Sequence, residues 1–389
     1  MLSTSHCTAL LQHLTGATLA PARGISGFEL AADLAASDHL RDGPAALDSL
    51  EQLTAARRVA EFFELEKAGT EELLLRRHLL SEWSGIVAQP YNDGTLGELW
   101  FHSGGTTGEP KVIHQSIARL HGEASELAAL APETRRIIAL VPLHHIYGFL
   151  WGVLLSAKTN VPLVHGQPAI DTVHHDLQTG DLVIGVPEWW HYLGRSGQDL
   201  PAGVTGVTST APTPAATIET LLAKGLNRMI EVYGSTETAG IGWRDNTADA
   251  FQLFSHWSRH DNDHLQGQDR QLYEIPDIVE WPTEQSLKPV KRRDNAVQVG
   301  GVNVWPEKIR AFVEQHPQVE ACAIRPMATD QGTRLKAFIV PVDKSRDEGE
   351  YRPVINGWLR EQLPAAERPI NLTIGHQLPR NEAGKLCDW

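Results

Sequence analysis

Four short apolar segments, each ending in a loop rich in Gly, Ser, Thr or Pro, most constrain how this chain can fold. They are RRIIALVPL at 135–143, DLVIGVPEW at 181–189, GVTGVTSTAP at 203–212 and RMIEVYGSTE at 228–237, with helical segments between them. Strands that alternate with helices form βαβ units and pair in a parallel sheet. Such sheets bind ligands beyond the carboxyl ends of their strands, so we expect the polar loops to carry a binding site.

The regions before and after these segments predict two domains. Helical patterns run through Leu47–Leu65 and Glu71–Val87. Beyond Arg292–Asp294 the pattern is that of a small α+β domain, with a helix at 306–319, strands at 319–327 and 334–342, and a helix near 353–363. Because 389 residues exceed the usual size of one core, we expect an α/β domain over 1–292, with parallel sheets flanked by helices, and a small mobile α+β domain over 293–389.

The composition excludes several classes of protein. A net charge of −14 opposes binding to phosphate backbones, so we expect no nucleic-acid partner. Cys7, Cys322 and Cys387 are odd in number and far apart, which predicts free thiols in a reducing cytoplasm. The first residues lack the features of a signal peptide, and no apolar run approaches the roughly 20 residues of a membrane helix. We therefore expect a cytoplasmic protein without a membrane partner.

A segment rich in glycine and hydroxyl groups, Phe101-His-Ser-Gly-Gly-Thr-Thr-Gly-Glu-Pro-Lys111, suits the binding of a polyphosphate. Its glycines leave the backbone flexible, and its N–H groups, hydroxyls and lysine can meet phosphate oxygens. In a Walker A loop the lysine directly follows the last glycine, whereas here Glu109-Pro110 separates Gly108 from Lys111. This spacing excludes a P-loop ATPase or kinase, and a plain turn remains the alternative for this segment taken alone.

Two further segments contain residues that can bind a nucleotide. Glu231-Val-Tyr-Gly-Ser-Thr-Glu237 offers an aromatic face to a base, a hydroxyl to a phosphate and a carboxylate to Mg²⁺. Leu378-Pro-Arg-Asn-Glu-Ala-Gly-Lys385 places a lysine after a glycine turn. Each signal alone is weak, because a strand-end turn or a solvated lysine gives the same pattern.

Together these segments resemble the adenylate-forming superfamily, which includes acyl- and aryl-CoA ligases, peptide-synthetase adenylation domains and luciferases. SGGTTGEPK resembles the phosphate loop of that family, YGSTE its adenylate and magnesium motif, and LPRNEAGK its catalytic-lysine motif. The resemblance covers roughly Phe101 to Lys385 and is to 4-coumarate-CoA-ligase-like members, in a compact aryl-acid-activating form. It implies that the large domain forms the adenylate and that the small domain carries the catalytic lysine.

The resemblance also implies roles for individual residues. The family has an acidic ribose ligand, then fourteen residues, then a hinge arginine, and Asp277 and Arg292 show the same interval. The implied ATP- and AMP-binding residues are Ser103, Gly104, Gly105, Thr106, Thr107, Gly108, Lys111, Thr210, Ala211, Pro212, Tyr233, Gly234, Ser235, Asp277 and Arg292. The implied catalytic residues are Lys385, Glu237, Thr236 and His145, with Glu237 also the Mg²⁺ ligand.

Two more segments complete the implied site. PLHHIYG at 142–148 resembles the segment that lines the acid pocket, for which the implied residues are His144, Tyr147, Gly148 and Gly240. We expect a flat aromatic pocket there, formed by Tyr147 with Phe149 and Trp151. VQVGGVNVWPEKI at 297–309 resembles the lining of the pantetheine tunnel, which implies that Gly300 and Gly301 meet the thiol and that Asp294 belongs to the hinge.

The sequence departs from the family in three places. Only about 100 residues precede the phosphate loop, and the stretch between YGSTE and Asp277 is short, with Ile-Pro-Asp where Thr-Gly-Asp is usual. Both differences predict a compact variant that lacks part of the N-terminal region and the accessory barrel. Gln298 stands where many members have lysine, so the resemblance gives no detailed role for this position in the thioester step.

The implied activity joins a carboxylic acid to a thiol through an acyl-AMP. It uses ATP and Mg²⁺, with CoA or an acyl carrier protein as the acceptor. The pocket segment has no Asp to pair with an ammonium group, so we expect an aryl acid of the benzoate or cinnamate type, as in ligases of secondary metabolism. The alternatives are a medium-chain fatty acyl ligase and a catalytically degenerate nucleotide-binding scaffold. The intact Lys111, Glu237, Asp277 and Lys385 argue against the scaffold.

Overall fold

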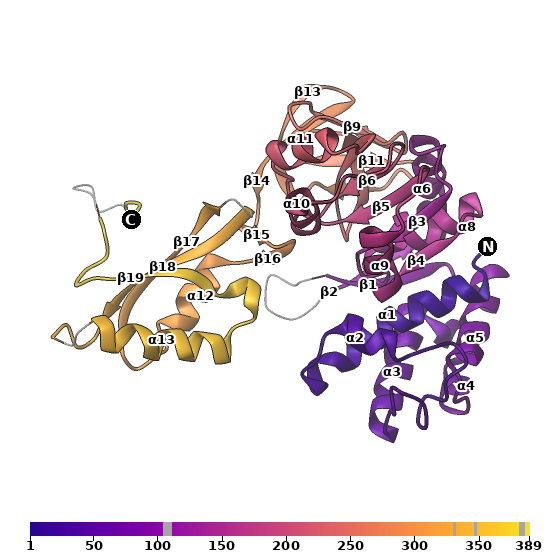
Figure 1. The fold of residues 1–389 in the computed structure, drawn as a ribbon, viewed down its shortest axis with the longest axis horizontal. Helices are drawn as coiled ribbons and strands as arrows, with labels where there is room; N and C mark the ends of the chain where they lie inside the picture. The colour runs from indigo at the N-terminus through magenta and orange to yellow at the C-terminus, as the bar shows by residue number, and fades with distance from the viewer. Residues whose placement is uncertain (104–110, 330–331, 346–347, 381–385) are drawn as a thin grey trace. The chain divides into compact units, whose positions relative to one another are not determined.

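The four apolar segments are parallel strands of one sheet, as predicted. The computed structural model describes residues 1–103, 111–329, 332–345, 348–380 and 386–389. The parallel strands, in spatial order, are β4 (Leu163–His165), β3 (Arg136–Ala139), β5 (Asp181–Gly185), β6 (Thr205–Thr208) and β7 (Arg228–Ser235) (Figure 1). The helices between them are α7 (Ile146–Gly148), the π-helix η2 (Phe149–Leu154), α8 (Leu155–Thr159), α9 (Gln167–His175), α10 (Pro187–Arg195) and α11 (Ala215–Ala223).

Alternate residues of the parallel strands enter different cores, because successive side chains of a strand point to opposite faces. Ile137 and Ala139 of β3 belong to the larger core, which also contains the N-terminal helices. Ile138 belongs to a second core, with Val173 of α9 and Leu221 of α11. Helices therefore cover both faces of these strands, which is the predicted α/β architecture.

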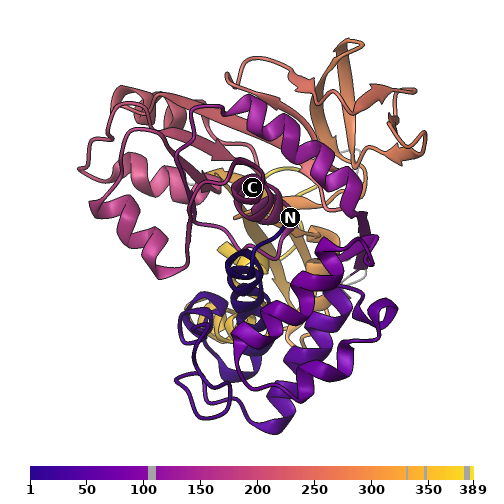
Figure 2. The same ribbon diagram turned by 90° about the vertical axis from the view of Figure 1, so that its right-hand side faces the viewer.

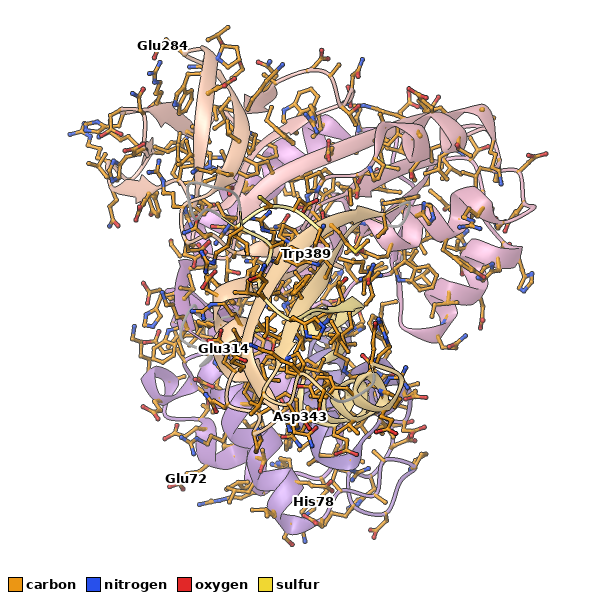
Figure 3. The ribbon with its side chains drawn as sticks, turned by 90° about the vertical axis from the view of Figure 1, so that its left-hand side faces the viewer. Glu72, His78, Glu284, Glu314, Asp343 and Trp389 are labelled. Atoms are coloured by element: carbon orange, nitrogen blue, oxygen red, sulfur yellow. The ribbon has the colours of Figure 1, made fainter. Side chains whose placement is uncertain are left out.

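Beyond β7 the sheet continues with antiparallel strands, which the sequence pattern did not predict. They follow in the order β8 (Ala239–Arg244), β9 (Phe251–Leu253), β14 (Ser286–Arg292) and β13 (Asp277–Thr283). Glu284 marks the tip of the β13–β14 hairpin (Figure 3). A separate sheet contains β10 (Trp257–Arg259), β11 (His264–Gly267) and β12 (Leu272–Glu274), and a two-stranded hairpin contains β1 (Glu98–Ser103) and β2 (Lys111–Ser116), which leads into α6 (Ile117–Leu130).

The N-terminal helices pack around α1 (Figure 2). They are α1 (Thr4–Arg23), α2 (Gly27–Ala32), α3 (Ser49–Phe62), the 3₁₀ helix η1 (Leu65–Ala68), α4 (Glu71–Leu75) and α5 (Leu80–Asn92). The helical pattern predicted over Glu71–Val87 is present as two helices, α4 and α5, with a break between them. The chain breaks after Leu75 because Leu79 forms a β-bridge with His39, and the indole N–H of Trp83 donates to the carbonyl of Arg77 at 3.2 Å.

Contacts between Cα atoms divide the chain into two units. Unit 1 contains Met1–Ser209, Thr213–Ile275 and Val279–Pro289, and unit 2 contains Thr210–Pro212, Pro276–Ile278 and Val290–Trp389. The remaining elements belong to unit 2 and are β15 (Val297–Val299), β16 (Val302–Val304), α12 (Pro306–Val313), β17 (Val319–Thr329), β18 (Gly332–Pro341), α13 (Glu348–Gln362), the 3₁₀ helix η3 (Ala365–Glu367) and β19 (Pro369–Ile374). The helix expected over 306–319 ends at Val313, ahead of Pro317, before which helical conformations are disfavoured.

The sheet of unit 2 is covered differently on its two faces. Helices α12 and α13 pack on one face, where Phe312 and Trp358 stack with ring centroids 4.9 Å apart. On the other face Phe338 meets Trp389, whose ring centroid lies 5.8 Å away (Figure 3). The strands and helices predicted for the small α+β domain are thus present.

The cysteines form no disulfide among the described residues. Cys7 and Cys322 are buried, and burial raises the pKa of each thiol to about 12. Cys387 is partly exposed. In the described part of the chain, every helix is too short or too polar to cross a membrane.

Candidate active site

The phosphate-loop segment is carried by the β1–β2 hairpin of unit 1. Ser103 at the end of β1 pairs directly with Lys111 at the start of β2, so the two ends of the loop lie side by side. Phe101 anchors the hairpin, because its ring packs edge to face on Phe62 and Phe149 with centroids 5.0 and 5.6 Å apart. The predictions for Gly104, Gly105, Thr106, Thr107, Gly108 and Lys385 lie outside the described residues.

The YGSTE motif spans the end of β7 and the turn into β8. Ser235 and Thr238 close this turn reciprocally, because the backbone N–H of each donates to the hydroxyl of the other at 3.2 Å. Gly234 is required here, since a Cβ would collide with the carbonyl oxygen of Ala239. The turn therefore has one well-defined backbone conformation.

Two side chains of this turn are accessible to a ligand. Thr236 is partly exposed and Glu237 is exposed, and the Glu237 carboxylate makes no hydrogen bond or ion pair with any described residue. Tyr233, on β7, is half-buried with its ring centroid 5.5 Å from that of Phe251. Mg²⁺ prefers oxygen ligands such as carboxylates, so Glu237 fits the expected metal ligand.

The STAP segment follows β6 and shows two features typical of a binding loop. Thr210 has a φ of 78°, which is costly for a β-branched residue. Its buried hydroxyl has no hydrogen-bond partner in the described part of the chain. The hydroxyl of Ser209 donates to the carbonyl of Val232 at 2.8 Å and ties the start of the loop to β7. Thr210, Ala211 and Pro212 belong to unit 2.

The expected ribose ligand and hinge arginine are close together in unit 2. Asp277 begins β13 and Arg292 ends β14, and Arg292 Nε lies 4.0 Å from Asp277 Oδ1. Arg292 also donates to both carboxylate oxygens of Asp294, at 3.1 and 2.9 Å. Burial alone would raise the pKa of Asp294, but hydrogen bonds from Arg292 and the Ala296 N–H hold it below its usual value. The fourteen-residue interval is thus a hairpin whose two ends meet.

Gly300 and Gly301 form the two-residue turn between β15 and β16. Their φ angles are 58° and 75°, and positive values at both positions are what a type I′ hairpin turn requires. A Cβ on Gly301 would lie 2.7 Å from Thr210 Oγ1. Within unit 2 this turn therefore lies against Thr210.

His144 and His145 line a cavity of about 320 Å³ in unit 1. The remaining wall is largely apolar, and its residues are His13, Ala17, Ala20, Pro21, Ile25, Gly27, Phe28 and Pro142. Helices α1 and α2 form this wall because they pack closely, and a Cβ on Gly16 would overlap the carbonyl oxygen of Gly27. The segment 142–145 thus faces the first two helices of the chain.

Burial lowers the pKa of the histidines that line this cavity and of His165, which lies beside His13. Burial lowers the pKa of His13 to about 3 and that of His165 to about 4. Desolvation also lowers the pKa of His144, to well below its usual value, and that of His145. His13 Nε2 and His165 Nδ1 lie 3.2 Å apart, whereas the buried Nδ1 of His144 has no hydrogen-bond partner among the described residues. His144 can therefore bond to a polar group of a ligand.

The expected pocket residues Tyr147, Phe149 and Trp151 do not line this cavity. The Tyr147 hydroxyl donates to the carbonyls of Gly185 and Val207, at 3.1 and 2.9 Å, beside the ends of β5 and β6. Phe149 and Trp151 lie within the larger hydrophobic core, at 0% and 1% exposure. Tyr147 therefore ties α7 to the sheet, while Phe149 and Trp151 fill the hydrophobic core.

The two glycines of the expected pocket allow close packing. A Cβ on Gly148 would collide with the carbonyl oxygen of Pro142, so Gly148 lets the helix approach the segment that carries the histidines. A Cβ on Gly240 would collide with the carboxylate of Glu123 and the ring of Phe254. Neither glycine lines the cavity.

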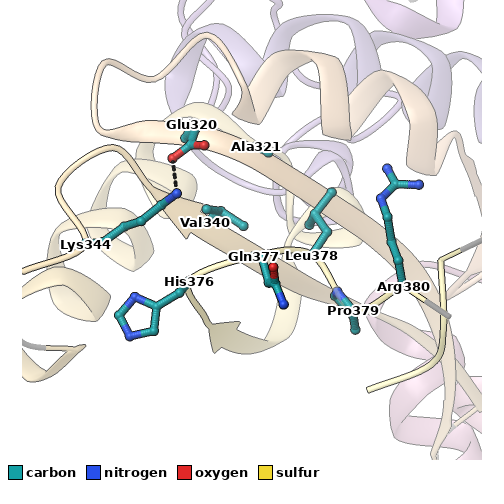
Figure 4. Close-up of a pocket in the computed structure, with 9 residues that line it drawn as sticks. All are labelled: Glu320, Ala321, Val340, Lys344, His376, Gln377, Leu378, Pro379 and Arg380. Atoms are coloured by element: carbon teal, nitrogen blue, oxygen red, sulfur yellow. Dashed lines mark ion pairs between the residues drawn. The ribbon is translucent and has the colours of Figure 1, made fainter. Parts of the chain in front are cut away.

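A second, open groove of about 580 Å³ lies in unit 2 (Figure 4). Its walls include the ion pair between Glu320 and Lys344, at 2.9 Å, and the segment 376–380. None of the predicted site residues that the structure describes lines this groove. Its lining does include Leu378, Pro379 and Arg380, the first three residues of the LPRNEAGK motif.

The structure adds residues that the sequence did not single out. The helical segment 1–95 was interpreted only as core, yet His13, Ala17 and Phe28 form the cavity wall. Gln115 and Arg119 donate hydrogen bonds to backbone carbonyls of the YGSTE turn. The sequence gives no sign that Gln115 is functional, because its polar side chain would ordinarily be expected on an exposed strand. Only the structure shows that Gln115 is buried.

The predicted residues fall in both units. The β1–β2 hairpin, the YGSTE turn and the histidine segment belong to unit 1. Thr210–Pro212, Asp277, Arg292, Asp294 and the Gly300–Gly301 turn belong to unit 2. Each unit thus brings together its own subset of the predicted site.

Comparisons with known proteins agree with these motifs. A sequence model of a family described as AMP-binding enzyme matches residues 75–261, and a model of the AMP-binding enzyme C-terminal domain matches residues 308–385. The chain is 36% identical to a 4-coumarate–CoA ligase of Halorhodospira halophila over 99% of each chain. It is 35% identical to a 4-coumarate–CoA ligase of Cereibacter sphaeroides over 88% of this chain and 83% of that protein.

Solved structures show a similar fold. One is the amide bond synthetase McbA from Marinactinospora thermotolerans, with a TM-score of 0.61, 17% identity and coverage of 75% of this chain and 68% of that chain. Another is the o-succinylbenzoate CoA synthetase of Bacillus subtilis, with a TM-score of 0.57, 20% identity and coverage of 74% and 67%. At these identities the likeness concerns the fold alone.

Proposed function

Because this chain belongs to the AMP-binding enzymes of the adenylate-forming superfamily, and is thus an acid–thiol ligase, we propose that its acid is a hydroxylated aryl acid and its thiol is CoA. The observation that carries the proposal is the similarity, over the whole chain, to a protein named 4-coumarate–CoA ligase. Cinnamate-type acids are the first candidates and benzoate-type acids the second.

The cavity of unit 1 supports an acid of this size and shape. Ligand pockets range from roughly 300 to 1,000 Å³, and a cavity of about 320 Å³ lies at the lower end of this range. A planar ring between the apolar α1–α2 wall and the uncharged His144 would gain about 0.5–1.5 kcal/mol from ring contacts. A flexible alkyl chain would instead lose rotamer entropy. His145 is the residue that we place beside the carboxylate.

In the first step, we propose, a carboxylate oxygen attacks the α-phosphate of ATP, and the bond to the leaving pyrophosphate breaks. Two anions must approach, so positive charge and hydrogen-bond donors are needed around the phosphates. The Ser103–Lys111 segment and Lys385 would supply them. Mg²⁺, when bound, would neutralise part of the phosphate charge, and Glu237 is the residue that would hold it.

Several side chains and the STAP loop are proposed to orient the adenosine part. Tyr233 would pack beside the AMP moiety and Thr236 would donate its hydroxyl to the phosphate. Asp277 would accept hydrogen bonds from the ribose hydroxyls, and Arg292, 4.0 Å from it, would lie at the phosphate or ribose edge. The strained Thr210 and its neighbours Ala211 and Pro212 would border the adenine.

In the second step, we propose, the CoA thiol attacks the acyl carbon and AMP leaves. Domain 293–389 would first rotate about Arg293–Asp294, which withdraws Lys385 and presents Gly300 and Gly301 to the pantetheine. The acyl-AMP is an activated anhydride, so this attack needs little further acid–base help.

An ATP–pyrophosphate exchange assay over a panel of aryl, fatty and amino acids tests the proposal. We expect exchange with hydroxycinnamates or hydroxybenzoates, and amino acids near background. In a competition for CoA, the aryl acid should exceed hexanoate and octanoate by at least about tenfold in kcat/KM, or about 1.4 kcal/mol. A preference for the fatty acid would overturn the aryl assignment alone. Absence of exchange with every acid would favour the nucleotide-binding scaffold.

A further inference from the structure

The turn that carries Thr236 and Glu237 is held by a side chain from the strand that follows the phosphate loop. Gln115 lies on β2 with 0% exposure. Its side-chain amide donates to the carbonyl oxygens of Thr236 and of Glu237, the latter at 3.1 Å. These bonds span more than a hundred residues of sequence and turn the backbone carbonyls of the motif inward.

A second side chain, from the first turn of α6, holds the same backbone. The guanidinium of Arg119 donates to the carbonyl of Thr238 at 3.3 Å and to that of Glu237 at 3.5 Å. It also donates to the side-chain oxygen of Gln115. Gln115 and Arg119 thus form one hydrogen-bonded clamp around three consecutive carbonyl groups.

Two aromatic rings pack against the Arg119 side chain of the clamp. The Arg119 guanidinium lies over the ring of Tyr273, 4.7 Å from its centroid, and 5.5 Å from that of Trp257. The indole N–H of Trp257 donates to the carbonyl of Gly240 at 2.7 Å, just beyond the same turn. A guanidinium between aromatic faces and carbonyl oxygens loses conformational freedom without losing its charge.

The clamp connects two parts of the proposed nucleotide site. Lys111 begins β2 and Gln115 lies four residues further along the same strand. Strands rise about 3.3 Å per residue, so β2 fixes a spacing of roughly 13 Å between these two Cα atoms. All of these residues belong to unit 1. The spacing between Lys111 and the Glu237 turn is therefore independent of any movement of unit 2.

We propose that Gln115 and Arg119 are positioning residues for adenylation, which act by fixing the Glu237 turn relative to Lys111. The inference rests on the proposed function, in which Lys111 and Glu237 serve the phosphates and Mg²⁺. A misplaced Glu237 would bind Mg²⁺·ATP in an unreactive geometry, so the adenylation rate should depend on the clamp. The thioester step, which needs no Mg²⁺ at the phosphates, should depend on it much less.

Two conservative variants test the clamp. Gln115→Glu keeps the size of the side chain but removes the amide N–H groups that donate to the turn. Arg119→Lys keeps the positive charge but removes the guanidinium, whose several N–H groups donate to different carbonyls. Arg259→Ala is the matched control, because Arg259 also lies over a ring, that of Trp281 at 4.8 Å, away from the turn. The readouts are pyrophosphate exchange as a function of Mg²⁺, thioester formation from synthetic acyl-AMP and CoA, and the melting temperature.

For both clamp variants we expect kcat of exchange to fall at least tenfold and the half-saturating Mg²⁺ concentration to rise at least threefold. The KM for the acid and the rate of thioester formation should stay within threefold of wild type. In the Arg259→Ala control, every readout should stay within threefold of wild type. Unchanged exchange, or equal losses in both half-reactions, would overturn the proposal. If the wild type exchanges pyrophosphate with no acid, the proposed function fails. The clamp is then tested by Mg²⁺-dependent ATP binding. A changed Mg²⁺ dependence in the two clamp variants supports the clamp, and an unchanged dependence overturns it.

Discussion

The buried carboxylate of Glu123 accepts a hydrogen bond from the backbone N–H of Gly240 at 3.0 Å. Burial raises the pKa of Glu123 to about 7, although nearby His256 and the Gly240 N–H oppose this shift. An exposed glutamate has a pKa of about 4.3. Between these values the folded chain keeps a proton that the unfolded chain has lost. Glu123 therefore lowers the free energy of unfolding as the pH rises from about 4.3 to 7, and no further above that.

Glu123→Gln should become more stable relative to wild type as the pH rises. The amide still offers an oxygen to Gly240 but does not titrate. Between pH 5 and pH 8 we expect the stability difference to move in favour of the variant by on the order of 1–3 kcal/mol. Urea unfolding of both proteins at both pH values measures it, with the exposed Glu284→Gln as the control. A difference that is the same at both pH values contradicts the raised pKa.

Asp277→Ala should weaken ATP binding much more than acid binding. A lost hydrogen bond to a charged group costs about 1.5–3 kcal/mol, which would raise the KM for ATP by roughly 10- to 150-fold while the KM for the acid stays nearly constant. Steady-state exchange kinetics with each substrate varied in turn will show this. Glu280→Ala, an exposed residue of the same strand, serves as the control. An unchanged KM for ATP would place the ribose ligand elsewhere.

Lys385→Ala should separate the two half-reactions. The lysine is expected to act on the phosphates in the first step only, so pyrophosphate exchange should be largely lost. Conversion of synthetic acyl-AMP and CoA to thioester should continue at nearly the wild-type rate. Lys344→Ala, whose residue pairs with Glu320 in the groove of unit 2, should leave both steps intact. Equal loss of both steps in Lys385→Ala argues against rotation of the small domain.

Ala17→Leu should narrow the cavity and select against longer acids. Ala17 lines the α1–α2 wall, and three additional carbon atoms would occupy the space proposed for the ring. We expect kcat/KM for 4-coumarate to fall at least about tenfold, or 1.4 kcal/mol, and that for benzoate to fall less. Thr18→Val, at the next residue of α1 and outside the cavity lining, is the control. If both acids decline equally, the cavity does not bind the ring.

The sequence predicts the parallel strands well because their signal is local. Segments such as 181–189 are short apolar runs buried on both faces, and each is followed by a polar loop. The Asp277 and Arg292 pair was found from a family interval, and its physical basis is the β13–β14 hairpin that brings the two ends together. Local patterns and fixed spacings therefore carry over from sequence to structure.

Features that depend on contacts between distant segments were not predictable. The break after Leu75 requires Leu79 to meet His39, although the leucine spacing alone favours a continuous helix. Phe149 and Trp151 have the composition of an aromatic pocket, but they pack into the core because α7 and η2 lie on the sheet. The cavity wall depends on the close packing of α1 against α2 at Gly16, which no periodicity indicates.

The unequal burial of the three thiols gives this chain a natural attachment point for a fluorophore. Maleimides react with thiolates, and a thiol with its pKa raised to about 12, as in Cys7 and Cys322, supplies almost none at neutral pH. Cys387 is partly exposed and lies two residues after Lys385. A dye placed there without any mutation would test the proposed rotation, because its emission would change during a single turnover if the lysine segment moved to another environment.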